Sequence, residues 1–176
     1  GRDDESWSIE YQTFPGDPSG RELWDTLEDF LFKSYQHANG VRLQIVAAAI
    51  DSGGHHTQAV YRFCKPKKMQ RRRIWAIKGM GGQGRAVWPA KPSRNNVGRV
   101  PLYILGVDAA KEMVYSRLAI ENPGPGYCHF PDTYEEHYFD QLTGEKVITK
   151  YKMGIPTRQW VLKSASQRVE ALDCRV

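Results

Sequence analysis

The chain has 176 residues, a length that suits one domain of ordinary size with its own hydrophobic core. No apolar run approaches the roughly 18 residues of a membrane span, and no signal peptide is evident, so we expect no membrane association. The net charge of +5 is unevenly spread: residues 1–30 hold nine acidic and two basic residues, whereas residues 52–107 hold twelve Lys and Arg and no acid. This segregation favours an anionic partner, most simply nucleic acid, over an ordinary solvated surface. Cys64, Cys128 and Cys174 have no CxxC spacing, and such a sparse, odd set indicates reduced thiols.

The first 40 residues predict an irregular segment of about 18 residues and then one amphipathic helix. Ser19 would be the N-cap of this helix, with Glu22 completing a capping box. Asn39-Gly40 would end the helix.

The apolar run Ile45–Ile50, within a strand predicted over about Val41–Ile50, is the centre of the predicted fold. It stops on Asp51 and then turns at Gly53-Gly54. An uninterrupted apolar run predicts a central parallel strand that is covered on both faces. The carboxyl ends of such strands are where open α/β sheets bind ligands, so Asp51 is a candidate functional residue.

The later elements follow from periodicity and from turn residues. In chain order, the sequence predicts a strand over Thr57–Cys64, a strand over Ile74–Ile77, a long loop over Lys78–Arg99, a strand over Leu102–Val107, a helix over Ala109–Ile120, a short strand over Tyr127–Phe130, a helix over Tyr134–Leu142, a hairpin of Glu145–Tyr151 with Gln159–Leu162, and a helical start over Arg168–Val176. Long loops inside compact domains are usually functional or mobile.

Three aspartates are candidates for one metal site. Asp51 and Asp108 each follow an apolar strand, and Asp173 lies on the last helical start. Carboxylates gathered at one sheet edge repel one another unless a cation lies among them, and hard ions such as Mg²⁺ prefer oxygen ligands. Two such ions, about 3.5–4 Å apart, can activate a water and stabilise the leaving oxygen in phosphodiester hydrolysis. Beside an acid-free basic segment, these acids predict a metal-dependent nuclease in which Lys and Arg of residues 62–99 hold the phosphates.

Each acid also has a structural interpretation. Asp108 could cap the helix that follows it, Asp51 could serve a turn, and Asp173 could be a cap or a surface charge. Further candidates, which rank below the three aspartates, are His55, His56, Glu112 and Glu170.

A GxGxxG pattern at Gly79, Gly81 and Gly84 follows the strand that begins at Ile74. A dinucleotide site needs a helix to open directly there, and the next residues are not helical in pattern. We therefore predict a flexible loop that can approach a phosphate backbone. Trp75 and Trp88 could stack on bases, although aromatic residues near strands more often belong to a core.

Several segments, in order, resemble the nuclease domain of the large terminase subunit of lambda-like tailed phages and prophages. From about Leu43 onward, they are AIDSGGHHTQAVYRFC, RRRIWAIKGMGGQGR, PLYILGVDAAKE, ENPGPGYCHFP and EALDCRV. The resemblance implies an α/β fold of the RNase H-like type, a mixed sheet with helices on both faces. It implies a single nuclease domain over residues 41–176, preceded over residues 1–40 by an N-terminal segment and a lead-in helix. We expect a C-terminally truncated fragment of a larger protein.

The resemblance also implies a Mg²⁺- or Mn²⁺-dependent endonuclease that cuts concatemeric double-stranded DNA by two-metal hydrolysis in the cytoplasm of the host bacterium. The implied partners are double-stranded DNA, the small terminase subunit, the portal protein and an ATPase motor domain of the same chain. By position, Asp51, Asp108 and Asp173 would be the catalytic metal ligands, with Glu170 or His55 as further candidate ligands. The candidate DNA-binding residues are Lys67, Lys68, Arg71, Arg72, Arg73, Lys78 and Arg85.

Two other functions remain open at this point. A basic DNA-binding or docking module, whose acids are caps, would show salt-dependent DNA binding without metal-dependent cleavage. Asp51-Ser52-Gly53-Gly54 followed by Thr57 also resembles the first phosphate loop of actin-like ATPases and sugar kinases, although the chain looks too short for the rest of that fold.

Overall fold

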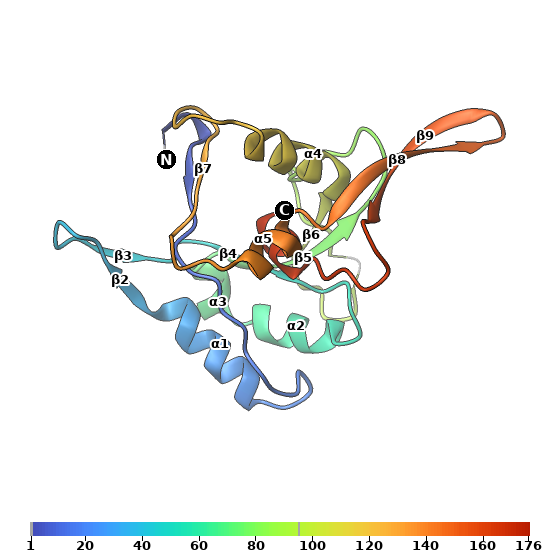
Figure 1. Ribbon diagram of the computed structural model, residues 1–176. Helices are drawn as coiled ribbons and strands as arrows, with labels where there is room; N and C mark the ends of the chain where they lie inside the picture. Colours follow the sequence, from blue (N-terminus) through green and yellow to red (C-terminus); the bar gives the residue numbers. More distant parts are fainter. Residues whose placement is uncertain (1, 95) are drawn as a thin grey trace. The chain divides into compact units, whose positions relative to one another are not determined.

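The computed structural model describes residues 2–94 and 96–176 (Figure 1). They divide into two compact units, one of residues 12–106 and one in which residues 1–11 join residues 107–176. Helices and strands occur in both units, which confirms the α/β class. Among the described residues, no helix has the length and apolar character that crossing a membrane would require.

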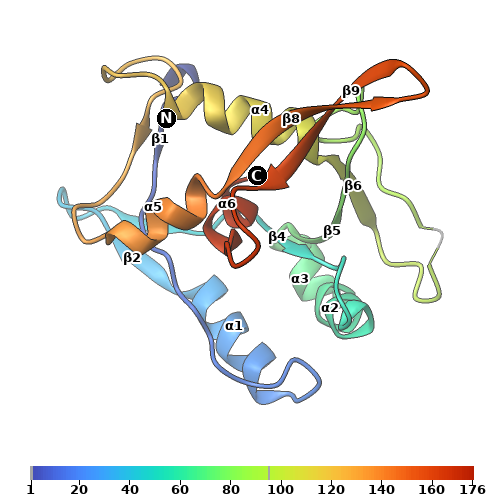
Figure 2. The ribbon, with the colours of Figure 1, turned by 45° about the vertical axis from the view of Figure 1, so that its right-hand side comes forward.

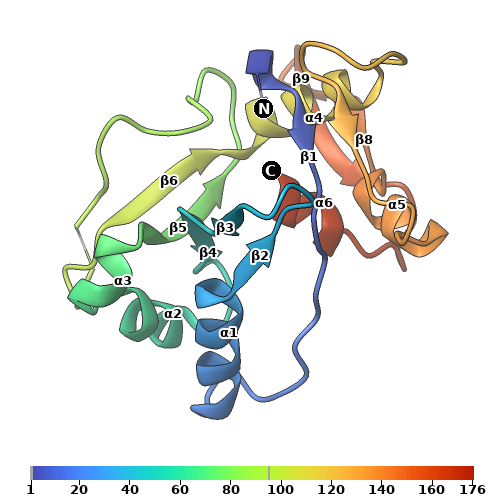
Figure 3. The ribbon, with the colours of Figure 1, turned by 90° about the vertical axis from the view of Figure 1, so that its left-hand side faces the viewer.

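The unit of residues 12–106 consists of helices packed on one side of a small parallel sheet. Its elements are α1 (Glu22–Phe32), β2 (Ser34–Gln36), β3 (Arg42–Gln44), β4 (Ala48–Asp51), α2 (Thr57–Cys64), α3 (Lys67–Arg71), β5 (Ile74–Met80) and β6 (Leu102–Gly106). The sheet has the order β4-β5-β6 and all its pairs are parallel. Figure 3 shows α1, α2 and α3 on the same side of this sheet.

The core of this unit lies between the sheet and its helices. Alternate strand residues face the helices, because successive side chains of a strand point to opposite faces. On that face, Ile74 and Ala76 of β5 and Leu102 of β6 are buried against helix residues such as Val60 and Met69. The intervening positions of β4, Ala49 and Asp51, point to the opposite face and are exposed. The strand pattern thus places Asp51 outside the core.

The described residues between β5 and β6 form no helix, and they return along the outer edge of β6 (Figure 3). The amide of Gly106 donates to the carbonyl of Ala86 at 3.0 Å, and Ser93 exchanges two backbone hydrogen bonds with Leu102 at 2.7 and 2.9 Å. A Cβ atom on Gly106 would lie 2.6 Å from the carbonyl oxygen of Arg85 and 2.7 Å from that of Ala86. Only glycine permits this close approach of two backbones.

Residues Thr57–Cys64 form helix α2, so the predicted strand is wrong. Their alternating apolar residues suit a strand, but the buried set Val60, Phe63 and Cys64 recurs every three or four residues, which is the period of a helix. The strands on either side, β4 and β5, are parallel, so their connection is a crossover rather than a hairpin turn. The predicted strand at Ile74–Ile77 is confirmed and extends to Met80.

The strand predicted over Val41–Ile50 is divided into two short strands, β3 and β4, so the prediction of one central strand is wrong. β3 pairs with β2 in a hairpin, whereas β4 pairs with β5 and lies at an edge of its sheet. Ala49 is exposed because, within this unit, the helices cover only the opposite face. Only β4 overlaps the apolar run Ile45–Ile50, whereas β3 is the mainly polar segment Arg42–Gln44.

The predicted limits of the first helix are also wrong. Helix α1 begins at Glu22 after Arg21 and has no side-chain cap, because the hydroxyl of Ser19 donates instead to the carboxylate of Asp17 at 2.6 Å. The helix ends at Phe32. Asn39-Gly40 lies in the turn of the β2–β3 hairpin, where Gly40 has a φ of 85° and the amide of Gly40 donates to the carbonyl of His37 at 2.9 Å.

The other unit combines a short parallel strand pair, a long hairpin and several helices (Figure 2). Its elements are the 3-10 turn η1 (Arg2–Asp4), β1 (Ser6–Trp7), α4 (Val107–Leu118), β7 (Cys128–His129), α5 (Glu136–Leu142), β8 (Glu145–Lys152), β9 (Ile155–Leu162) and α6 (Glu170–Arg175). The predicted helices, short strand and hairpin are confirmed here. The prediction that the first 18 residues are irregular is confirmed only in part, because Ser6 and Trp7 form β1, which pairs with β7.

The core of this unit gathers residues from three helices that are far apart in the sequence. Val114 of α4, Tyr138 and Leu142 of α5, and Leu172 of α6 are buried together. The guanidinium of Arg175 also donates to the hydroxyls of Ser6 at 2.7 Å and Ser8 at 2.8 Å, which ties the first residues to the last helix. The cysteines of both units, Cys64, Cys128 and Cys174, are free, as the sequence predicts.

Candidate active site

Asp51 is the last residue of β4 and its carboxylate is exposed at the carboxyl end of the parallel sheet. Oδ1 accepts the amide N–H of Gly53 at 3.0 Å. A Cβ atom on Gly53 would lie 3.2 and 3.3 Å from the two carboxylate oxygens, so the glycine leaves room for the carboxylate against the turn. Asp51 makes no ion pair with a described residue, and its Oδ2 accepts no hydrogen bond from one.

The turn that follows Asp51 is fixed to the sheet and to helix α2. Ser52 is 2% exposed, and both its amide and its hydroxyl donate to the carbonyl of Ile77 on β5 at 2.8 Å. The hydroxyl of Thr57, the first residue of α2, lies 2.7 Å from the carbonyl oxygen of Ser52 and 2.9 Å from that of Gly54. Because the turn is bonded at both ends, the position of Asp51 is defined by the fold.

A cavity of about 340 Å³ borders this turn. Its apolar lining includes Trp24 and Val60, and its polar lining includes Asp51, His55 and His56. Both histidines are exposed, which fits the expectation that loop histidines face solvent. A role of His55 as a ligand stays a prediction.

The other two predicted aspartates belong to the other unit. Asp108 is the second residue of α4, so it lies inside the helix and not at the N-cap position just before it, and an acid in this first turn favours the helix dipole. Asp173 is exposed on α6. Within neither unit do the described residues bring three His, Cys, Asp or Glu side chains together as a metal ion would need. The cluster of Asp51, Asp108 and Asp173 therefore stays a prediction.

The lower-ranked acids are held in ion pairs with arginines. Arg168 donates to Oε1 of Glu170 from Nε at 2.8 Å and from Nη2 at 2.7 Å, and this hydrogen bonding lowers the pKa of Glu170. Glu112 on α4 pairs with Arg158 on β9 at 2.9 Å. Both pairs are at the surface, with side chains 47–75% exposed, so we expect them to add little to stability.

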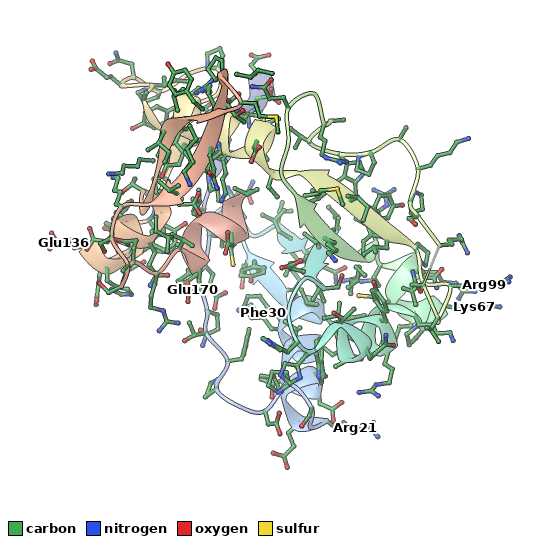
Figure 4. The ribbon with its side chains drawn as sticks, turned by 90° about the vertical axis from the view of Figure 1, so that its right-hand side faces the viewer. Arg21, Phe30, Lys67, Arg99, Glu136 and Glu170 are labelled. Atoms are coloured by element: carbon green, nitrogen blue, oxygen red, sulfur yellow. The ribbon has the colours of Figure 1, made fainter. Side chains whose placement is uncertain are left out.

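The predicted DNA-binding residues fall into two groups, all within the unit of residues 12–106. Some have structural partners: Lys68 pairs with Glu28, Nε of Arg85 donates to the carbonyl of Gly81 at 3.1 Å, and Arg72 lies over the ring of Phe32 at 4.8 Å. The remainder are exposed and pair with no described residue. These unpaired cations are Lys67, Arg71, Arg73 and Lys78. Figure 4 shows Lys67 pointing outward from this unit, at the same margin as Arg99.

Three aromatic residues form a cluster in the unit of residues 12–106. Trp75, Trp88 and Tyr103 are in mutual contact, with ring centroids 4.8–5.5 Å apart. Trp88 is 43% exposed, so the cluster is not a closed core. The two tryptophans are predicted from the sequence as residues that could stack on bases, but Tyr103 is not. Alternation alone could not have identified Tyr103, because only the register of β5 and β6 places it beside Trp75 on one face of neighbouring strands.

Comparisons with known proteins agree over the whole chain. The family model described as "Terminase large subunit gpA, endonuclease domain" matches residues 1–176. The chain is 32% identical over 183 residues to the terminase large subunit of Escherichia phage lambda, an alignment that covers 100% of this chain and 28% of the relative. It is 30% identical over 182 residues to the terminase large subunit of Enterobacteria phage P21, which covers 98% of this chain and 27% of the relative.

The chain thus spans 28% and 27% of the length of these two relatives. No solved structure matches it. The match of the family model to all 176 residues nevertheless shows the family: the chain belongs to the endonuclease domains of the terminase large subunit gpA.

Proposed function

We propose that this chain is a metal-dependent DNA endonuclease domain that acts in viral DNA packaging. The observation that carries the proposal is the match of an endonuclease-domain family to residues 1–176. The placement of Asp51 supports it, because this exposed carboxylate ends a strand of a parallel sheet, where α/β proteins place their ligands.

The chemistry of Asp51 fits a hard divalent cation. Mg²⁺ and Mn²⁺ take oxygen ligands, and Oδ2 of Asp51 has no hydrogen-bond donor among the described residues. No described Lys or Arg neutralises this carboxylate, although residues 52–107 are rich in both. We propose Asp51, Asp108 and Asp173 as the ligands of one or two such ions, with Glu170 and His55 ranked below them.

In this proposal the ions supply Lewis-acid chemistry at the phosphodiester, and the protein holds the DNA. The unpaired cations (Lys67, Arg71, Arg73 and Lys78) would contact phosphate oxygens and position the backbone without reading its sequence. Binding of this kind weakens steeply as salt rises, because each phosphate contact releases counterions.

The finer parts of the proposal follow from the family resemblance. They are an RNase H-like fold, two-metal cleavage of concatemeric double-stranded DNA, and action in the host cytoplasm with the small terminase subunit, the portal protein and an ATPase motor domain of the same chain. The parallel pairing of β4, which carries Asp51, with β5, and of β5 with β6, is compatible with such a fold.

Nicking of supercoiled plasmid tests the function. The chain should nick with Mn²⁺ or Mg²⁺ and not with EDTA, and Asp51→Asn should reduce nicking to the EDTA level while DNA binding is retained. Asp25→Asn is the matched control, because Asp25 is an exposed aspartate on α1 of the same unit, where it pairs with Arg21.

Unchanged nicking by Asp51→Asn would contradict the proposed role of this residue. DNA binding without nicking under any metal would point to a basic docking module instead, and the same pair of variants in the full-length protein would then decide whether a motor domain is required.

A further inference from the structure

The aromatic cluster of Trp75, Trp88 and Tyr103 has the build of a stacking surface. The rings of Trp88 and Tyr103 are stacked, with centroids 4.8 Å apart and planes 29° apart. Trp75 contacts both rings at a tilt of 54°, with its ring centroid 5.3 Å from that of Trp88 and 5.5 Å from that of Tyr103. An indole that is 43% exposed and already held by two other rings offers a fixed aromatic face to a ligand.

The aromatic cluster lies on the same sheet face as Asp51. Asp51 of β4 is in register with Ile77 of β5, and Ile77 is in register with Tyr103 of β6. Residues in register on neighbouring strands point to the same face, and Trp75 shares that face because it lies two residues before Ile77. With strands about 4.8 Å apart, the backbones at Asp51 and Tyr103 are about 10 Å apart along one row of the sheet.

The segment that carries Trp88 is anchored and positively charged. Its backbone is hydrogen-bonded to the edge of β6 through Ala86 and Ser93, so Trp88 is held at a fixed place over the sheet. Lys91 and Arg94 of this segment are exposed and pair with no described residue. The aromatic face is thus flanked along the chain by cations that suit a phosphate backbone.

We infer that the aromatic cluster stacks an unpaired nucleobase of a DNA strand that runs past Asp51. Bases inside a duplex cover one another's faces, so a fixed aromatic face can accept only a base that has left the stack. The cations of the same segment would hold the adjoining phosphates. This inference rests on the proposed nuclease function for its link to cleavage, but the stacking itself can be measured without any cleavage.

The test is binding of fluorescent oligo(dT) and of a blunt duplex of equal length, measured by anisotropy in EDTA. Trp88→Leu keeps an apolar side chain but removes the ring, and should weaken oligo(dT) binding about 10-fold while leaving duplex binding unchanged. Trp88→Phe restores an aromatic ring and should bind oligo(dT) almost as well as the unmodified chain. Trp7→Leu is the matched control. Trp7 is 52% exposed and is stacked on His129, and both residues belong to the unit that does not contain Trp88.

Equal losses for both DNA forms, or no loss for oligo(dT), would overturn the inference. If Trp88→Leu loses its cooperative melting transition, the unmodified chain is tested instead by photocrosslinking to an oligonucleotide that contains 5-bromodeoxyuridine. The crosslink should form at Trp88 or Tyr103. Adducts confined to other residues would refute stacking on this cluster. Selective loss in Trp88→Leu, together with no nicking by this chain or by the full-length protein, would support the stacking site and refute the proposed nuclease. Normal oligo(dT) binding by Trp88→Leu, together with Asp51-dependent nicking, would refute the stacking site and support the nuclease.

Discussion

The ion pair between Lys111 of α4 and Glu145 of β8 should be the most costly polar contact to break in its unit. Nζ of Lys111 lies 2.6 Å from Oε2 of Glu145, and the two side chains are only 13% and 10% exposed. The backbone of Glu145 is held as well: its carbonyl accepts the hydroxyl of Tyr115 at 2.8 Å and its amide donates to the same oxygen at 3.2 Å. The carboxylate therefore has no easy route to water when its cation is removed.

Lys111→Met leaves this carboxylate buried without a partner, which should lower the free energy of unfolding by about 3–5 kcal/mol. For a chain of this size, that loss corresponds to a fall in melting temperature of roughly 6–20 °C. The measurement is urea unfolding followed by circular dichroism, with thermal melts alongside.

An exposed pair between the same two elements provides the control. Glu112 and Arg158 join α4 to β9 at 2.9 Å, but their side chains are 50% and 59% exposed, so Arg158→Met should cost only about 0–1 kcal/mol. The double variant Lys111→Met with Glu145→Met should regain most of the lost stability, because no charge is left buried. If Lys111→Met cost no more than Arg158→Met, or if the double variant were as unstable as the single one, the argument from burial would be refuted.

Two further predictions concern single groups. Gly106→Ala places a methyl group 2.6 Å from a carbonyl oxygen and should lower the free energy of unfolding, measured in urea, by about 1–3 kcal/mol. Gly54→Ala is the control and should lower it far less, because nothing lies within 4 Å of its Cβ position. Equal losses of stability in the two variants would contradict this steric argument. Burial, as the largest cause, raises the pKa of Tyr138 above its ordinary value of 10.0. The stabilisation that the neutral Tyr138 phenol provides is therefore fully present below pH 10 and is lost as the pH rises through the raised pKa. Tyr138→Phe cannot titrate, so it should move the pH midpoint of alkaline unfolding upward. An unchanged midpoint would exclude the titration of Tyr138 as a cause of alkaline unfolding.

The elements that the sequence predicts well are those whose local signals agree with one another. The hairpin of β8 and β9 combines β-forming residues with a turn at Gly154, whose φ is 78°, and its predicted position is confirmed. The helix predicted over Ala109–Ile120, which the structure shows at Val107–Leu118, and the strand at Ile74 are confirmed for the same reason: apolar periodicity and flanking breakers indicate the same element.

The errors arise where one local signal permits two structures. Asn39-Gly40 can end a helix or form a hairpin turn, and only the pairing of β2 with β3, which lies outside the local sequence, selects the turn. Thr57–Cys64 can alternate as a strand or recur as a helix, and the parallel direction of β4 and β5 selects the helix. Local propensity is overridden by tertiary pairing in both cases.

The candidate site shows the same division. That a strand would end on Asp51 and turn at glycines could be seen in the sequence, and the structure confirms both. Tyr103 could not be grouped with Trp75 and Trp88 before the register of β5 and β6 was known, because a period of two marks a face but not a neighbour. Whether Asp108 and Asp173 share a metal with Asp51 likewise depends on more than local pattern.

The pairing of β1 with β7 has a consequence for the order in which the chain can fold. Residues 12–106 are one continuous stretch, so this unit has all its parts once β6 has left the ribosome. The other unit begins earlier but needs Ser6 to pair with Cys128, a separation of 122 residues, and then Arg175 to bond Ser6 and Ser8. Contacts over such separations form slowly. The unit whose first residues are synthesised first is therefore the one that must close last.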